Sequence, residues 1–176
     1  GHEVAAAHGP SGDRYVQHLV GLTEPLDGLS IVLDCANGAM SHVAPAAFRA
    51  LGAQVVVIHD APDGRNINDG CGATHVESLS AAVAANAATM GLAFDGDGDR
   101  VIAVDHQGRV IDGDRLIGLA AIQLLEEGRL HHDTVVVTVM SNLGFHKAMA
   151  AAGITVVTTA VGDRYVLEAL DAGGFS

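Results

Sequence analysis

The sequence predicts an α/β protein made of two similar three-layer α/β domains with mixed sheets, the second of them truncated. Short runs rich in Val, Ile and Leu alternate with segments of helical spacing along most of the chain. A strand, an Asn-containing turn, a helix and a second strand follow one another over 29–58, and the same order returns over 134–158. With 176 residues the chain is long enough for two small domains with separate cores.

Composition limits the classes of partner. The net charge is −12 and the sequence has no basic run, which argues against nucleic acid as a partner. Hydrophobic residues make up 49% and aromatic residues only 3%, so the core must be built from Ala, Val, Leu and Ile. There is no signal-peptide pattern and no apolar run of transmembrane length. We therefore expect a cytoplasmic protein without a membrane partner.

We expect residues 1–25 to form a leader with a short helix, and residues 26–107 to form the first domain. A Thr74-x-x-Glu77 capping box predicts a helix that runs to about residue 88. Gly52 ends an earlier helix. The expected elements are a helix at 13–20, strands at 29–33, 54–58, 91–94, 101–104 and 109–111, and helices at 43–51 and 74–88.

The second domain is expected to cover residues 108–176. Its first helix is predicted by apolar residues at helical spacing, and its strands by runs rich in Val and Thr. The expected elements are helices at 112–127, 145–152 and 163–172, and strands at 134–139 and 154–158.

The segment Phe94–Arg100 has the sequence FDGDGDR and follows a short buried strand. Its glycines can adopt positive φ, so the backbone can curl and bring the side chains of Asp95, Asp97 and Asp99 together. Carboxylates held this close repel one another unless a cation lies between them. Hard oxygen ligands on a tight loop favour Mg²⁺.

Plain turns and EF-hand loops also contain closely spaced Asp and Gly residues. Strings rich in Asp and Gly are also common in plain turns. An EF-hand counted from Asp95 would need its glycine at the position of Arg100 and its bidentate glutamate at the position of His106. The EF-hand is therefore excluded, and three Asp residues in strict alternation with Gly favour a metal site over a turn.

Other polar residues receive structural interpretations. Cys35 and Cys71 lack metal-type spacing and are expected to be free thiols of a reducing compartment. His59 and His75 also show no ligand spacing. The side chain of Asn37, next to Gly in a turn, is expected to hydrogen-bond the backbone of its own turn.

The chain resembles the α-D-phosphohexomutase family over nearly its whole length, from about Asp13 onward. The combination of NIN-x-x-CGAT with VGDRYV favours the member that acts on glucosamine phosphates over the phosphomannomutase and phosphoglucomutase relatives. The motifs that carry the resemblance are VLDCANGA (32–39), PDGRNIN (62–68), CGATH (71–75), FDGDGDR (94–100), IDGD (111–114), MSNLG (140–144) and VGDRYVLE (161–168).

The resemblance implies an enzyme with four domains around one cleft, of which this chain resembles the middle two. The first of the two carries the metal loop, and the second is a sugar-binding domain that is incomplete here. The implied site residues are Asp95, Asp97 and Asp99 for Mg²⁺, Arg100 as the catalytic residue, and Gly162, Asp163 and Arg164 for the substrate. The sequence departs from many relatives at Ala160, where they carry lysine.

The implied reaction interconverts glucosamine 6-phosphate and glucosamine 1-phosphate and so feeds cell-wall amino-sugar nucleotide synthesis. Two phosphoryl transfers would pass through a bisphosphorylated sugar and a phosphoserine on a missing domain. The expected partners are the phosphosugar and the missing N- and C-terminal domains of the same enzyme. We expect this chain alone to be inactive.

A phosphomannomutase or phosphoglucomutase activity is one alternative, and two other classes of function are also open. A phosphatase of the haloacid-dehalogenase type would use Asp95 as the nucleophile and Asp97 as the acid/base, but it prefers Thr or Val where Asp99 stands. A divalent-ion or partner-binding module would have no catalytic activity. A hydrolase would release phosphate without help, whereas a mutase fragment would release none.

Overall fold

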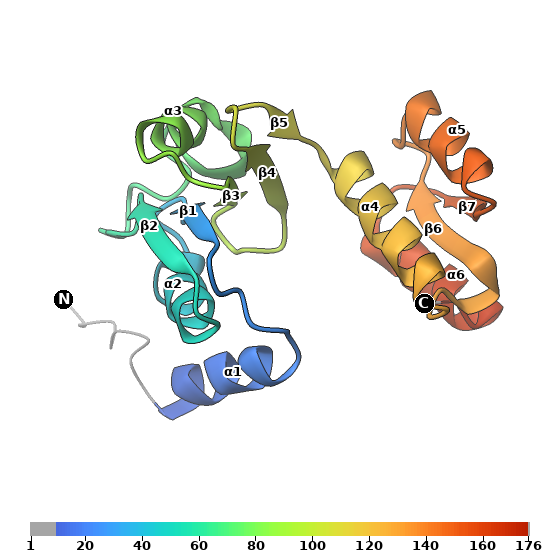
Figure 1. Cartoon of the computed structure of the whole chain (residues 1–176), viewed down its shortest axis with the longest axis horizontal. Helices are drawn as coiled ribbons and strands as arrows, with labels where there is room; N and C mark the ends of the chain where they lie inside the picture. Colours follow the sequence, from blue (N-terminus) through green and yellow to red (C-terminus); the bar gives the residue numbers. More distant parts are fainter. Residues whose placement is uncertain (1–9, 176) are drawn as a thin grey trace. The chain divides into compact units, whose positions relative to one another are not determined.

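The computed structural model describes residues 10–175 of the chain, which divide into two compact units (Figure 1). The first unit ends at Ile111 and the second begins at Asp112. The boundary predicted from the sequence lies after residue 107. The difference arises because β5 (Val110–Ile111) pairs with β4 (Val101–Asp105) and so belongs to the first sheet.

The first unit contains a five-stranded mixed sheet with the order β2-β1-β3-β4-β5. Strand β1 is parallel to β2 and to β3, whereas β3 and β5 are antiparallel to β4. The mixed sheet agrees with the predicted fold class. Its first three strands are β1 (Ser30–Asp34), β2 (Gln54–Ile58) and β3 (Met90–Phe94).

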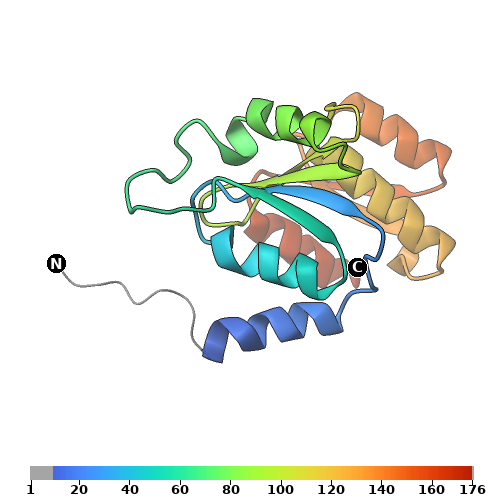
Figure 2. The same cartoon turned by 60° about the vertical axis from the view of Figure 1, so that its left-hand side comes forward.

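Helices cover both faces of this sheet (Figure 2). Alternate side chains of a strand point to opposite faces, so Ile31 and Leu33 pack with α2 (Met40–Ala50), while Val32 packs with α3 (Glu77–Ala85). Helix α1 (Pro10–Gly21) lies against α2 on the side away from the sheet. The result is the expected three-layer arrangement.

The capping box predicted at Thr74 and Glu77 is wrong. Thr74 lies in a short 3-10 helix, η1 (Gly72–Thr74), and its hydroxyl lies 3.1 Å from Nδ1 of His75. Helix α3 begins only at Glu77, and its N-cap residue, Val76, makes no side-chain capping bond. The reason is tertiary, because a hydrogen bond from Gly72 N to the Asp34 carboxylate holds the start of η1 in place.

The second unit contains two parallel strands, β6 (Thr134–Thr138) and β7 (Thr155–Thr159). Helices α4 (Gly113–Glu126) and α5 (Leu143–Ala151) enclose one core on a single face of these strands, and α6 (Asp163–Gly173) contacts both strands. A 3-10 turn, η2 (His131–Asp133), leads into β6. The buried members of the core are Ala121, Leu130, Val135, Val137, Phe145, Met149 and Ile154.

Side-chain caps fix where α4 and α5 begin. The carboxylate of Asp112 accepts a hydrogen bond from Arg115 N at 3.0 Å, and Oδ1 of Asn142 accepts one from Phe145 N at 3.0 Å. Oδ2 of Asp114 also accepts bonds from the backbone N and the side-chain Nδ2 of Asn142 at 2.8 and 2.6 Å. The starts of the two helices are thereby joined. Within residues 10–175 every helix is too short or too polar to cross a membrane.

Candidate functional site

The loop after β3 brings three carboxylates together. One oxygen each of Asp95, Asp97 and Asp99 lies within 4.8 Å of the other two. Gly98 has φ +77°, in the left-handed region that favours glycine, and its N–H donates to Asp95 O at 3.1 Å. The conformational freedom of glycine therefore allows the chain to curl around one point.

Asp95 is the buried member of the group, and Arg100 holds its carboxylate in place. Oδ1 accepts a hydrogen bond from Arg100 N at 3.1 Å, and Oδ2 accepts one from Arg100 Nε at 2.8 Å. Nη2 of Arg100 also lies 2.8 Å from Oδ2. Burial would raise the pKa of Asp95, but the backbone N–H of Arg100, Asp99 and the guanidinium outweigh it and lower that pKa. The carboxylate of Asp95 is therefore ionised and held in a fixed position.

The pKa of Asp99 shifts in the opposite direction to that of Asp95. Its pKa is raised, first by the hydrogen bond with Asp95, then by burial and by the negative charges of Asp95 and Asp97. The charge of Arg100, whose Nε lies 3.5 Å from Asp99 Oδ1, only partly offsets this effect. The group thus carries more negative charge than the protein neutralises, and a divalent cation would relieve it. Three carboxylates fit Mg²⁺ by donor chemistry, because hard cations prefer oxygen ligands.

Two other segments hold the loop from either side. Ala39 N donates to Gly96 O at 2.8 Å, and a Cβ on Gly38 would overlap the backbone of Gly96. On the other side, a Cβ on Gly96 would lie 2.7 Å from Asn68 Nδ2 and from the side chain of Ile67. Gly38 therefore cannot be enlarged without moving the acidic loop (residues 95–100), whereas a Cβ on Gly96 would displace the side chains of Ile67 and Asn68.

Asp34 fixes a third segment against the strand that leads into the loop. Its carboxylate is fully buried and accepts hydrogen bonds from Ala36 N and Gly72 N, each at 3.0 Å. Gly72, at φ +73°, lies directly against the carbonyl oxygen of Phe94. The VLDCANGA and CGATH segments therefore meet at the residue before Asp95, which sequence spacing did not reveal.

The side chain of Asn37 does not bond its own turn, contrary to the prediction. Its Oδ1 accepts a hydrogen bond from Ala61 N at 3.2 Å, and its Nδ2 donates to Asn66 O at 3.4 Å. These bonds connect the turn after β1 with the irregular segment 59–72. That segment lacks regular structure over most of its length but is anchored beside the loop.

The structure places Gly162, Asp163 and Arg164 at the start of α6 in the second unit. Gly162 is the N-cap residue with φ +136°, and its carbonyl accepts a hydrogen bond from Tyr165 N at 3.0 Å. The side chain of Arg164 is 82% exposed and pairs with Glu168 at 2.7 Å. This segment presents one acidic and one basic residue to solvent.

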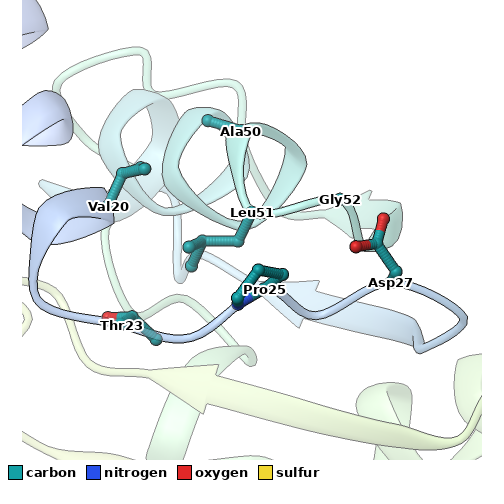
Figure 3. Close-up of a pocket in the computed structure, with 7 residues that line it drawn as sticks. All are labelled: Val20, Thr23, Pro25, Asp27, Ala50, Leu51 and Gly52. Atoms are coloured by element: carbon teal, nitrogen blue, oxygen red, sulfur yellow. The ribbon is translucent and has the colours of Figure 1, made fainter.

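A separate pocket lies between the end of α1 and the turn after α2 (Figure 3). Asp27 supplies its one carboxylate and Thr23 its one side-chain hydroxyl. None of its lining residues belongs to the acidic loop, so the pocket is not part of the candidate metal site.

Comparison with known proteins identifies matches to both units. Residues 13–108 match the family model described as phosphoglucomutase/phosphomannomutase, alpha/beta/alpha domain II. Residues 112–176 match alpha/beta/alpha domain III of the same family. Together the two models account for nearly all of the chain.

Curated relatives are similar over the same region. A phosphoglucosamine mutase of Frankia casuarinae is 60% identical over 164 residues, which cover 93% of this chain and 36% of that protein. A phosphoglucosamine mutase of Rhodococcus jostii is 58% identical over 167 residues, 94% of this chain and 38% of that protein. The chain thus spans somewhat more than a third of the length of these relatives.

Solved structures share the fold. A phosphoglucomutase/phosphomannomutase family protein from Burkholderia thailandensis superposes with a TM-score of 0.82 at 27% identity, covering 93% of this chain and 36% of that one. The apo form of an N-acetylglucosamine-phosphate mutase superposes with a TM-score of 0.64 at 21% identity, covering 92% of this chain and 38% of that one. The second likeness concerns the fold alone.

Proposed function

Because the chain belongs to the phosphoglucomutase/phosphomannomutase family, as its motifs predicted, we propose that it forms the two central domains of a phosphoglucosamine mutase. The full-length protein would interconvert glucosamine 6-phosphate and glucosamine 1-phosphate, a step that supplies amino-sugar nucleotides for the cell wall. The observation that carries this proposal is the 60% identity to a curated phosphoglucosamine mutase. The full-length protein would work in the cytoplasm.

The acidic loop is the proposed metal site. Asp95, Asp97 and Asp99 would hold Mg²⁺, which when bound neutralises negative charge on the phosphate oxygens during phosphoryl transfer. Asp95 would also fix the shape of the loop through its partly buried hydrogen bonds to Arg100. The tight packing of Gly38 and Gly72 against the loop supports this preorganisation.

Arg100 is the proposed catalytic residue of this chain. Its Nε and Nη2 are engaged by Asp95, while the side chain as a whole is 67% exposed. A guanidinium held in this way keeps its charge and can direct its remaining N–H groups to an anion. We assign Arg100 to the phosphate group being transferred.

Gly162, Asp163 and Arg164 are the proposed substrate contacts. They begin α6, where the first backbone N–H groups of a helix have no partner inside the helix and attract anions. Asp163 would accept hydrogen bonds from sugar hydroxyls, and Arg164 would pair with a phosphate in place of Glu168. The phosphoserine and the remaining substrate contacts would come from domains outside this chain.

An assay of full-length protein and of the 176-residue chain tests the proposal. We expect the full-length protein to interconvert the two glucosamine phosphates faster than the corresponding mannose or glucose phosphates, and the chain alone to convert none of them. Release of inorganic phosphate by the chain alone would instead support a hydrolase. A full-length protein that prefers mannose or glucose phosphates would contradict the assignment to glucosamine.

A further inference from the structure

A second group of ligand-type side chains lies at one edge of the first sheet. One ligand atom each of Asp34, His59 and Cys71 lies within 4.8 Å of the other two. Asp34 ends β1, and its register partner on β2 is Ile58, so His59 emerges from the parallel neighbour at the same edge. Cys71 arrives from the irregular segment. Sequence spacing gave no sign of this group because its members meet only at the sheet edge.

The contact between His59 and Asp34 requires a proton or a cation between the two side chains. Nδ1 of His59 lies 3.1 Å from Oδ2 of Asp34, yet this nitrogen is buried and makes no hydrogen bond. Two atoms that each carry a lone pair repel at this distance unless a proton or a cation lies between them. Oxygen and nitrogen ligands of a tetrahedral zinc ion lie about 3.3 Å apart, since each is about 2.0–2.1 Å from the metal. The observed separation is close to that value.

The sulfur of Cys71 is the third ligand-type atom of this group and is a softer donor than oxygen or nitrogen. The residue is fully buried, and Nδ2 of Asn37 lies 3.8 Å from its sulfur. The other cysteine, Cys35, belongs to the core on the opposite face of β1 and is not a member of the group. The side chain of His59 is 32% exposed although its Nδ1 is buried, so an ion would enter by displacing this partly exposed ring.

We propose that Asp34, His59 and Cys71 form a binding site for a zinc-class divalent ion. A set of one oxygen, one nitrogen and one sulfur donor suits Zn²⁺ and Co²⁺, whereas Mg²⁺ prefers oxygen alone. Binding would replace the proton of the Cys71 thiol, which is released to solvent. The proposal does not depend on mutase activity.

The proposed ion would tie together three segments that surround the acidic loop. Gly72 follows Cys71, donates to Asp34 and lies against the carbonyl of Phe94. An ion held by Asp34 and Cys71 would therefore brace the backbone just before Asp95. Its binding is expected to raise the denaturation midpoint of the 176-residue chain.

A Co²⁺ titration of the reduced 176-residue chain tests the proposal. We expect near-ultraviolet thiolate-to-cobalt absorption that Zn²⁺ removes by displacement. Cys71→Ser should abolish this absorption, and His59→Asn should weaken Co²⁺ binding by at least the 10–100-fold typical of losing an outer-shell partner. Cys35→Ser and Asp97→Asn are the matched controls and should leave the absorption unchanged.

Far-ultraviolet circular dichroism checks the fold of each variant. His59→Asn serves as the decisive variant if Cys71→Ser does not fold, because His59 is partly exposed while Cys71 is fully buried. Absence of the thiolate absorption in the folded wild-type chain would overturn the proposal. Absorption that persists with unchanged Co²⁺ affinity in His59→Asn would also overturn it, and so would absorption that is lost in Cys35→Ser.

Discussion

The three carboxylates of the acidic loop differ in whether a neighbouring positive charge neutralises them. Asp95 is buried and bound by Arg100, so its charge is matched within the protein. Asp97 and Asp99 are exposed, and the pKa of Asp99 is raised by its hydrogen bond to Asp95 and by its acidic neighbours. At the residue scale the loop therefore contains one carboxylate that Arg100 neutralises and two exposed carboxylates whose charge favours a cation.

The substitution Asp97→Asn tests this difference in charge in the metal-free chain. The substitution keeps the shape of the side chain but removes the charge that repels Asp95 and Asp99. We expect the metal-free chain to unfold at the same or a higher denaturant concentration than wild type. A markedly lower midpoint for Asp97→Asn would show that the side chain serves the turn itself rather than a metal.

Gly38→Ala tests the close approach to the loop. Its new Cβ would overlap the backbone of Gly96, so the loop must shift, at a cost of about 1–3 kcal/mol in the free energy of unfolding. Gly113→Ala is the control, since that position has open space and begins helix α4. Denaturant unfolding should show a loss for Gly38→Ala and little change or a gain for Gly113→Ala. Equal midpoints for the two variants would contradict the packing described.

Protonation of Asp105 is expected to lower the stability of the folded chain in acid. Hydrogen bonds from Arg109 and Gln107 to its carboxylate, with the charge of Arg109, lower the pKa of Asp105 to about 2. Its ordinary pKa in an unfolded chain is about 3.9. A depressed pKa stabilises the folded state above the unfolded value, and that contribution is lost as pH falls from about 4 to about 2.

The corresponding measurement is the denaturation midpoint as a function of pH. Asp105→Asn should unfold earlier than wild type at pH 7, and its midpoint should fall less between about pH 4 and pH 2. Asp171→Asn, an exposed position on α6, is the control and should keep the wild-type slope. An unchanged slope in Asp105→Asn would contradict the assigned interaction.

At the scale of elements, helix starts depend on side-chain caps that differ between the two units. Asn142 caps α5 and also bonds Asp114, which lies in the first turn of α4. Helix α3 has no side-chain cap, and its start is set by contacts of the preceding η1. The second unit therefore relies on Asn142 for two connections.

Asn142→Ala should cost about 1 kcal/mol in the free energy of unfolding, the usual loss for an N-cap residue. Asn86→Ala is the control because Asn86 is exposed at the end of α3 and makes one local hydrogen bond to Ala82 O. Its cost should be about 0.5 kcal/mol or less. Urea unfolding of both variants measures the difference, and equal losses would argue against the cap.

The elements show what local pattern could predict and what it could not. The Val-rich run at 54–58 was predicted at its observed bounds because its β-branched residues and the preceding Gly52 are local signals. Helix α2 begins at Met40, three residues before the predicted 43, because the turn at Gly38 is shaped by the distant Gly96. The convergence on Asp34 and the bonds of Asn37 were missed for the same reason.

At the scale of the whole molecule, each unit has a core of its own and carries its own group of proposed functional residues. The first unit holds the acidic loop, and the second holds the start of α6. The resemblance predicted both segments from their motifs. Because the chain covers little more than a third of its curated relatives, we assign the proposed reaction to the full-length protein.

The mutase rate of full-length Asp97→Asn as a function of Mg²⁺ concentration tests the central claim most directly. If Asp95, Asp97 and Asp99 hold the ion, kcat/KM should fall by roughly 100-fold or more at moderate Mg²⁺, and higher Mg²⁺ should restore part of it. Asp60→Asn, an exposed acidic position outside the group, should retain the wild-type rate. A full-length Asp97→Asn protein with the wild-type rate at every Mg²⁺ concentration would contradict the metal-site assignment.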